Sequence, residues 1–177
     1  TNDYGSADYY YVNKSSLPKV YGGFNTSLSW KGFDLSAIFA YSIGGYIYNR
    51  DVTMILHNGS LEGRDWSTEI LRRWTPDNRY TDVPALSTTS NNWNSASTRF
   101  LQNNSYMRLK NLTLSYNLPK QWISKLSLSS VQVYVQGDNL FTIHRNQGLD
   151  PEQGITGITY YRYPAMRTIS GGINVSF

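Results

Sequence analysis

The chain of 177 residues carries a net charge of +4, but only 16% of its residues are charged and 15% are aromatic. Its basic residues are scattered along the sequence, which argues against a nucleic-acid-binding patch, and the absence of cysteine excludes disulfides and cysteine-based zinc sites. Mean hydropathy is −0.47, so the polarity comes from Ser, Thr, Asn and Gly, a composition typical of strands and turns.

Residues 1–21 are polar and rich in tyrosine, and we predict that they form a loop. Apolar and polar side chains then alternate, which predicts two strands over 22–30 and 33–47 joined by a turn at Gly32. One face of the second strand carries a row of apolar side chains, namely Phe33, Leu35, Ala37, Phe39, Tyr41, Ile43 and Ile47. The two strands are therefore predicted to form a hairpin.

Residues 48–104 break the alternation and are predicted to form a long connection. Within it, the stretch RDWSTEILRRWTPDN predicts one short helix, with Asp65 or Ser67 as its N-cap and Pro76 as its stop. The apolar residues at near-helical spacing are Trp66, Ile70 and Trp74. A connection of this length is uncommon in a compact domain and usually has a function or is partly disordered.

Alternation returns over 106–118, 131–141 and 167–177, and a second long connection, 142–165, precedes the last strand. Each of these strands has apolar residues on one face, while Asn, Ser, Thr and Gln dominate the other. None of them reads as a uniformly buried run, so the predicted sheet is antiparallel with one polar face.

The length of the strands favours a membrane barrel. About 11 residues rise roughly 36 Å, and a tilt near 40° leaves about 28 Å, close to the ~25 Å apolar band of outer-membrane barrels. The short connections at 31–32 and 119–130 alternate with the two long ones, as periplasmic turns and extracellular loops do. No stretch has the length and apolar character of a membrane helix, and no signal peptide is visible. The chain is therefore predicted to be all-β and part of an antiparallel transmembrane β-barrel.

Two charged residues do not fit this pattern. Arg108 and Lys110 share the parity of Leu112 and would lie on the apolar face. A cation in the middle of a bilayer costs about 2–4 kcal/mol. We therefore expect both residues at the outer rim, where they reach lipid headgroups, or beside a β-bulge.

Five strands cannot close a barrel, because an open edge in lipid leaves backbone groups unpaired and bacterial barrels begin at about eight strands. We therefore expect residues 1–177 to be the C-terminal part of a larger barrel domain. The ending GGINVSF resembles the C-terminal signal of outer-membrane barrel proteins. With Phe177 in the periplasm, the N-terminal end of this piece is extracellular, and an exported chain would need residues before Thr1. The expected extracellular loops are 1–21, 48–104 and 142–165.

Six stretches resemble the C-terminal part of the SusC/RagA family of TonB-dependent outer-membrane transporters. They are LPKVYGGFNTSLSWKGFDLSAIFAYSIGG, RWTPDN…TDVPAL, STRFLQNNSYMRLKNLTLSYNLP, VQVYVQGDNLFT, GLDPE and YPAMRTISGGINVSF. They follow one another in this order and span nearly all of residues 17–177. The resemblance implies the last five strands of a plugged barrel of about 22 strands, with one short helix in an extracellular loop.

The resemblance also implies a nutrient importer in the outer membrane of a Gram-negative bacterium. The expected cargo is an oligosaccharide or a peptide. The expected partners are a SusD-like surface lipoprotein, the rest of the same barrel with its N-terminal plug, TonB acting through that plug, and outer-membrane lipid. No cofactor and no nucleic acid is expected. Two other hypotheses stay open, a soluble carbohydrate-binding β-sandwich and a fragment of a barrel adhesin or barrel enzyme.

Four aromatic residues of the long connection are candidate binding residues, namely Trp66, Trp74, Tyr80 and Trp93. Aromatic rings at the mouth of a barrel can stack on sugar rings or pack against a lid protein. The same rings can instead anchor the loop to itself, with Trp66 and Trp74 on one face of the predicted helix. Both interpretations stay open.

The two histidines, His57 and His144, lie in the connections. His144 with Asp150 and Glu152 matches no metal-ligand spacing, and DPEQG is a poor match to a calcium loop. No nucleophile and base occur in a supporting context. We therefore predict no catalytic residues, no metal site and no enzymatic activity.

Overall fold

The computed structural model describes residues 3–59, 61–87, 92–146, 148, 150–152 and 154–177. The chain forms two compact units. The first, called the sheet unit, consists of 18–45, 104–152 and 163–177, and the second, called the loop unit, consists of 1–17, 46–103 and 153–162. Among the described residues, no helix is long and apolar enough to cross a membrane.

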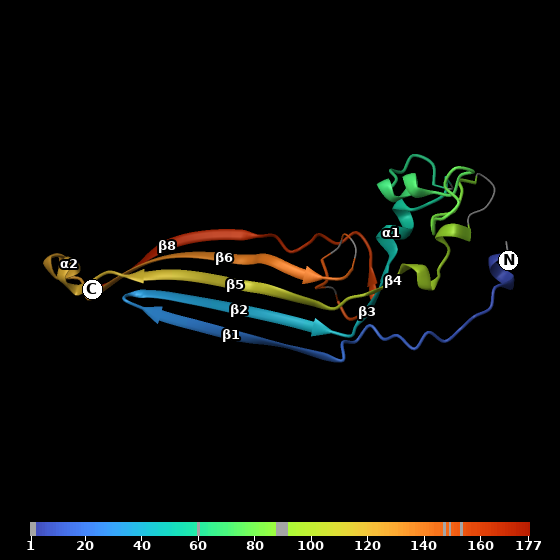
Figure 1. The fold of residues 1–177 in the computed structure, drawn as a ribbon. Helices are drawn as coiled ribbons and strands as arrows, with labels where there is room; N and C mark the ends of the chain where they lie inside the picture. Colours follow the sequence, from blue (N-terminus) through green and yellow to red (C-terminus); the bar gives the residue numbers. More distant parts are fainter. Residues whose placement is uncertain (1–2, 60, 88–91, 147, 149, 153) are drawn as a thin grey trace. The chain divides into compact units, whose positions relative to one another are not determined.

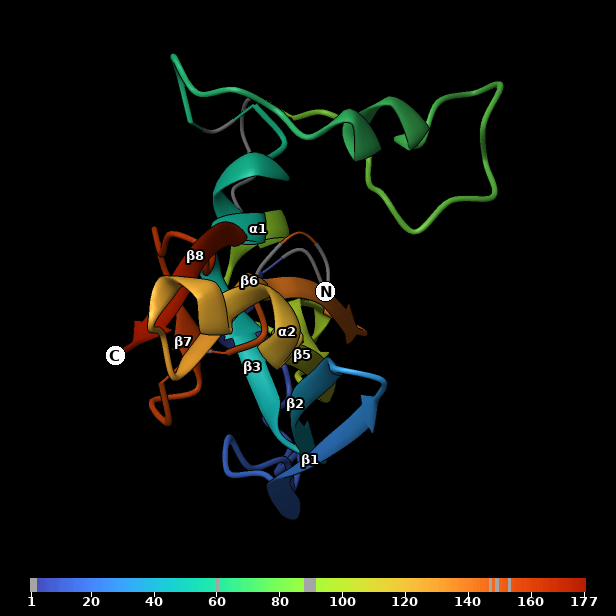
Figure 2. The ribbon, with the colours of Figure 1, turned by 90° about the vertical axis from the view of Figure 1, so that its left-hand side faces the viewer.

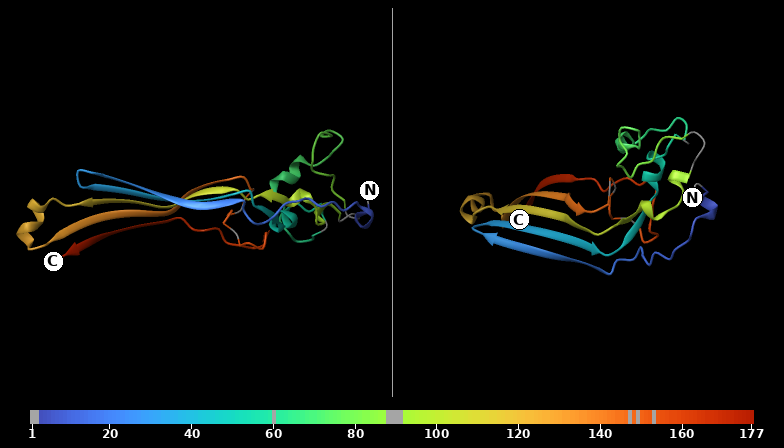
Figure 3. Two further views of the ribbon diagram at one scale, coloured as in Figure 1. Left: turned by 90° about the horizontal axis from the view of Figure 1, so that it is seen from below. Right: turned by 45° about the vertical axis from the view of Figure 1, so that its right-hand side comes forward.

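The sheet unit is built on one 5-stranded antiparallel sheet with the strand order β1-β2-β5-β6-β8 (Figure 1). The views in Figure 3 show it as a single twisted layer. Its strands are β1 (Val20–Trp30), β2 (Phe33–Ile43), β5 (Tyr106–Asn117), β6 (Ser130–His144) and β8 (Thr168–Ser176). The alternating sequence thus forms an antiparallel sheet, as predicted.

The prediction of one strand over 33–47 is wrong, because the chain bends at Gly44. Gly44 has φ of +92°, a backbone conformation that glycine adopts without steric cost. Its N–H donates to the hydroxyl of Ser105 at 3.0 Å instead of continuing the ladder. Strand β2 therefore ends at Ile43, and the chain enters the loop unit after Gly45.

The connections at the other end of the sheet are short. Lys31 and Gly32 have φ of +48° and +89° and join β1 to β2 in a tight hairpin turn that suits the strand twist. Between β5 and β6 the chain forms α2 (Lys120–Ile123) and the 3-10 helix η5 (Ser124–Leu126), which the sequence pattern did not predict.

The two faces of the sheet differ in chemistry. Paired residues form apolar rows across the strands on one face, such as Phe33–Tyr116–Val133–Ile173. On the other face the rows are polar, such as Ser36–Thr113–Gln136–Ser170. Leu28 is 66% exposed and Ile173 is 65% exposed, so the apolar face is not covered as a soluble core would be.

A β-bulge in the middle of the sheet changes the parity of β5. Ile38 pairs with Asn111 and Phe39 pairs with Leu109, so Lys110 has no partner on β2. The pairing with β6 is irregular at the same place. Beyond the bulge Leu109 and Phe39 lie on the apolar face and Arg108 lies on the polar face. A bulge was one of the two predicted explanations, and it removes Arg108 from the apolar face.

The loop unit has its own 3-stranded sheet with the order β4-β3-β7. Its strands are β3 (Tyr46–Asn49), β4 (Leu101–Asn103) and β7 (Ile158–Thr159). Helix α1 (Arg50–Ile55) follows β3 (Figure 2). The side chain of Asn49 caps it by accepting from the N–H of Val52. The buried apolar residues of this unit are Ile47, Leu56, Ile70, Val83 and Phe100.

The predicted helix at residues 64–78 is much shorter than expected. It is the 3-10 helix η2 (Thr68–Arg72), and Ser67, one of the two predicted caps, accepts from the N–H of Glu69. Arg73 is extended, and the N–H of Trp74 then bonds to the carbonyl of Val83. The other 3-10 helices of the described loop unit are η1 (Tyr4–Ser6), η3 (Asn92–Asn94) and η4 (Thr98–Phe100).

Candidate functional site

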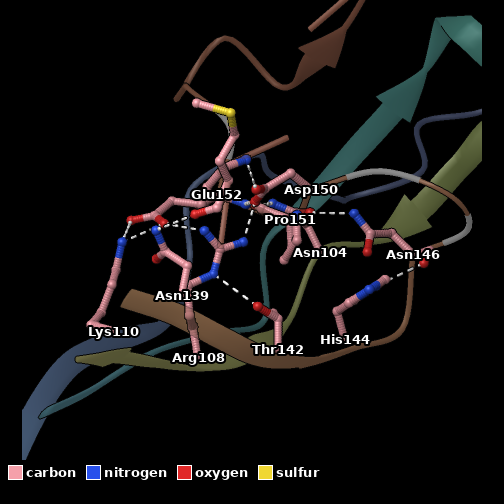
Figure 4. A network of polar contacts seen from close by, with 12 residues as sticks. Asn104, Arg108, Lys110, Asn139, Thr142, His144, Asn146, Asp150, Pro151 and Glu152 are labelled. Carbon is pink, nitrogen blue, oxygen red and sulfur yellow. Dashed lines mark hydrogen bonds and ion pairs between the residues drawn. The ribbon is translucent and has the colours of Figure 1, made fainter. Parts of the chain in front are cut away.

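Arg108 is the centre of a polar network on the polar face of the sheet unit (Figure 4). Its side chain is only 3% exposed. Its guanidinium donates to the hydroxyl of Thr142 at 2.9 Å and to Glu152 at 2.9 Å, and it forms an ion pair with Asp150. A planar guanidinium holds several acceptors at once, which suits a side chain that joins β5, β6 and a loop.

Lys110 completes the charge balance of this network. Its Nζ lies 2.6 Å from Oε1 of Glu152. We call Arg108, Lys110, Asp150 and Glu152 the clamp. The bulge makes the clamp possible, because it lets Lys110 reach Glu152 while Arg108 lies on the polar face.

Asp150 also holds the backbone of the loop. Its carboxylate accepts from the N–H of Glu152 at 2.9 Å and from the N–H of Ala165 at 2.6 Å. Burial raises the pKa of Asp150, but these two N–H bonds and Arg108 outweigh burial and hold the pKa below its usual value. Asp150 is therefore ionised at neutral pH and ties two parts of the loop to the sheet.

Amide side chains extend the network beside the clamp. Asn104 donates to the carbonyl of Pro151 at 2.8 Å, and Asn146 donates to the side-chain oxygen of Asn104 at 3.1 Å. His144 Nδ1 lies 2.9 Å from the carbonyl of Asn146. The carboxylates of Asp150 and Glu152 are thus engaged by cations and N–H groups, and no group of three metal-ligating side chains occurs in the described ranges.

A cavity of about 370 Å³ lies beside the clamp in the sheet unit. Its volume is within the range of small-molecule sites. The lining mixes cations, amides and apolar side chains, and its residues are Arg108, Asn139, Phe141, Thr142, His144, Gly148, Asp150, Pro151, Pro164, Ala165 and Arg167. It can accept a small polar or anionic group.

Two of the four predicted binding residues anchor the loop unit. The indole N–H of Trp66 donates to Nδ1 of His57 at 3.1 Å, and the indole N–H of Trp93 donates to the carbonyl of Leu56. The guanidinium of Arg99 lies 3.5 Å from the centre of the Trp93 ring. These contacts support the anchoring interpretation for Trp66 and Trp93.

The other two predicted binding residues differ in exposure. Tyr80 is fully exposed, whereas Trp74 is 44% exposed, no more than Trp66 at 45%. Among the described residues, no ring contact joins Trp74 or Tyr80 to Trp66 or Trp93.

A cluster on the loop unit, not predicted from the sequence, consists of Tyr160, Tyr161, Arg50, Asp51 and Arg64, and we call it the tyrosine cluster. The two tyrosine rings lie 4.1 Å apart, and Arg50 lies 4.5 Å from the ring centre of Tyr160. Arg64 donates to the hydroxyl of Tyr161 at 2.8 Å, and Asp51 accepts from its N–H at 2.9 Å. The hydrogen bond from Arg64 lowers the pKa of Tyr161. The feature of the sequence that could have indicated this cluster is the group of three tyrosines at positions 160, 161 and 163.

His57 is a buried hydrogen-bond acceptor in the loop unit, with 1% of its surface exposed. Its Nδ1 accepts from the N–H groups of Gly59 and Leu61 as well as from Trp66. Burial is the main cause that lowers the pKa of His57, and the charge of Arg64 adds to it, while a hydrogen bond with the Arg64 backbone opposes both. The ring is therefore neutral at pH 7.

We expect the loop unit to become less stable as the pH falls from 7 to 5. The unfolded chain takes up a proton near pH 6.5, whereas the folded chain resists it, so the stability is complete above about pH 6.5 and declines below it, by at most about 1.4 kcal/mol per pH unit. Hydrogen exchange of the Gly59 and Leu61 amides, corrected for the intrinsic pH dependence of exchange, measures this loss. His57→Asn keeps an acceptor without the titration, so an equal decline in that variant would contradict the prediction.

Comparison with known proteins gives several relatives over nearly the whole chain. The chain is 34% identical over 166 residues to TonB-dependent receptor P3 of Formosa agariphila, which covers 88% of this chain and 16% of that receptor. It is 27% identical over 168 residues to TonB-dependent receptor SusC of Bacteroides thetaiotaomicron, with 94% of this chain and 16% of that receptor covered. No protein-family model matches the chain.

A solved structure of the RagAB peptide importer in the "closed-closed" state matches with a TM-score of 0.83 and 36% identity. The match covers 94% of this chain and 18% of that chain. The chain therefore spans less than a fifth of the length of the proteins that it resembles.

Proposed function

This chain is homologous over nearly its whole length to TonB-dependent receptors of the SusC/RagA type, and we propose that it forms the last strands of the barrel wall of such an importer. The homology confirms the predicted family resemblance. It also agrees with the prediction that the chain is not part of an enzyme, because the relatives are receptors and importers. Homology to these receptors implies the outer membrane as the location.

The observation that carries the proposal is the sheet with two different faces. Its apolar face is exposed, and its polar face carries Ser, Thr, Asn and Gln, which suit a wet lumen. Strands β1 and β8 each pair on one side only within the described part of the chain. In lipid both free edges require partner strands, which the rest of the barrel supplies.

The orientation follows from the lengths of the connections. The ends of β2, β5 and β6 that lead into long segments face outward, and the short turns at Gly32 and α2 face the periplasm. The plug and the contact with TonB lie in other parts of the receptor. The RagAB complex supports a SusD-like lipoprotein as the partner on the outer side.

The proposed cargo is an oligosaccharide or a peptide, and the description of RagAB as a peptide importer supports the peptide. Trp74, Tyr80 and the tyrosine cluster are the proposed contacts with cargo or with the lipoprotein, because their rings are exposed. Trp66 and Trp93 act on this contact indirectly by holding the loop unit in shape.

Uptake by cells that carry the full-length receptor tests this function. We expect the receptor to fractionate with the outer membrane, to be purified together with a SusD-like lipoprotein, and to support TonB-dependent uptake of labelled peptides or oligosaccharides. Tyr80→Ala is expected to weaken uptake or lipoprotein binding, with the matched exposed residue Tyr11→Ala as control. Unchanged uptake of both cargo classes in cells without the receptor would refute the importer function.

A further inference from the structure

A second cavity of the sheet unit lies on its apolar face, near the ends of β2, β5 and β6. It is an open groove of about 380 Å³ lined by Tyr41, Ile43, Ser105, Tyr106, Met107, Ile143, His144 and Arg145. The side chains of Tyr41, Met107 and Ile143 form one row across the three strands. Within the described residues, Ile143 of this row is 64% exposed, the neighbouring Ile43 is 53% exposed, and Tyr41 and Met107 are half-buried, so the row is open to the surface.

Exposed cations flank the groove. Arg145 follows the last residue of β6 and lines the groove itself. On the side of β1, the N–H of Lys19 bonds to the carbonyl of Ile43 at 2.8 Å, and its side chain lies against Gly44. Both residues are exposed, and neither forms an ion pair with another described residue.

The groove therefore combines an apolar floor with positive charge at the level where the strands end. An apolar floor on the lipid side of a barrel favours an acyl chain, and Lys and Arg at the membrane surface favour an anionic headgroup. Tyr41 and Tyr106 add rings that suit the boundary between the two regions. The acyl chain of a neutral phospholipid would contact the apolar floor, but its headgroup would gain no net attraction from Lys19 and Arg145.

We propose that this groove binds a phosphorylated glycolipid of the outer leaflet, with an acyl chain along Tyr41, Met107 and Ile143 and phosphate groups on Lys19 and Arg145. This inference rests on the proposed orientation, in which these strand ends face outward. The bound lipid packs beside the junctions at Gly44 and Arg145, where the chain leaves the sheet for its long connections.

Lipid binding to the purified full-length receptor in detergent tests the proposal. The probe is bisphosphorylated lipid A, and native mass spectrometry counts the bound copies during titration. Replacing each cation by glutamine is expected to weaken binding about fivefold, and Lys19→Gln with Arg145→Gln together roughly 25-fold. Met107→Trp, which fills the floor, is expected to remove one bound lipid while the receptor stays folded.

Matched controls separate this site from general lipid binding. Lys31→Gln and Lys120→Gln remove cations at the opposite end of the same sheet and are expected to leave the affinity unchanged. Dephosphorylated lipid A is expected to bind the wild type and the double variant equally. Equal affinity of the wild type and the double variant for bisphosphorylated lipid A would overturn the proposal, as would equal binding of phosphatidylethanolamine. Because the assay uses purified receptor, failed lipid binding with intact uptake refutes only the lipid site, and failed uptake with intact lipid binding refutes only the importer.

Discussion

Arg108→Ala is expected to release the segment around Asp150 and Glu152 from the sheet and to lower the free energy of its local opening by about 3–5 kcal/mol. The variant removes the Arg108 cation from the carboxylate of Asp150, whose side chain is 7% exposed in the wild type. It also removes the hydrogen bond to Thr142, so the contact between β6 and the loop weakens as well. Hydrogen exchange of the Glu152 and Ala165 amides, which donate to Asp150, measures the loss directly.

Further variants show whether the loss comes from the buried charge of Asp150 after its ion pair with Arg108 is removed. Asp150→Asn in the Arg108→Ala background removes that charge and is expected to recover part of the protection. Arg108→Lys keeps the charge but not the planar donor arrangement, so an intermediate result is expected. If Arg108→Ala leaves both amides as protected as in the wild type, the clamp does not hold the loop.

The clamp is expected to hold at every pH that the outer membrane normally meets. Because the folded chain holds the pKa of Asp150 below its usual value, the contribution of Asp150 to stability is complete above about pH 3.9 and is lost as the pH falls further. The pH dependence predicted for His57 begins about 2.6 units higher. The loop unit should therefore loosen in mild acid while the clamp stays closed.

The sheet could be predicted from sequence because period-two alternation is a local signal. It identified the five strands of the large sheet, their antiparallel arrangement and the two faces without knowledge of any distant contact, although it placed the end of β2 too late and gave no sign of β3, β4 and β7. It failed at the bulge, because counting by parity assumes that every residue of β5 faces a partner. Arg108 and Lys110 were therefore assigned to the same face as Leu112, whereas Arg108 lies on the opposite face.

The clamp was not predicted because its hydrogen bonds join residues 42 and 44 positions apart in the sequence. The sequence pattern placed Arg108 and Lys110 as cations on the apolar face. It showed Asp150 and Glu152 as carboxylates without metal-ligand spacing. Neither the two cations nor the two carboxylates had an evident partner in the sequence. Their pairing in the folded chain explains both, because buried charges are paired. The folded loop unit escaped prediction for a related reason, since its short elements are stabilised by a core that draws on residues as distant as Ile47 and Phe100.

Val135→Arg is expected to prevent stable insertion of the receptor into the outer membrane. Val135 lies on the apolar face of β6, in the row Leu35–Leu114–Val135–Gly171, and is 47% exposed. An arginine near the bilayer midplane costs about 2–4 kcal/mol, and membrane barrels have no water there to compensate. The folded fraction in outer-membrane preparations, read from the altered gel migration of unheated receptor, measures the effect.

Gln136→Arg is the matched control, one residue further along the same strand. Gln136 lies on the polar face, where its side-chain amide donates to Asp138 at 3.2 Å, so an arginine there gains a carboxylate partner and stays in water. Insertion is expected to be close to that of the wild type. If the two variants insert equally well, the apolar face does not meet lipid. If Gln136→Arg alone fails, the two faces are inverted, and the lumen would then be lined by the row that contains Leu35 and Leu114.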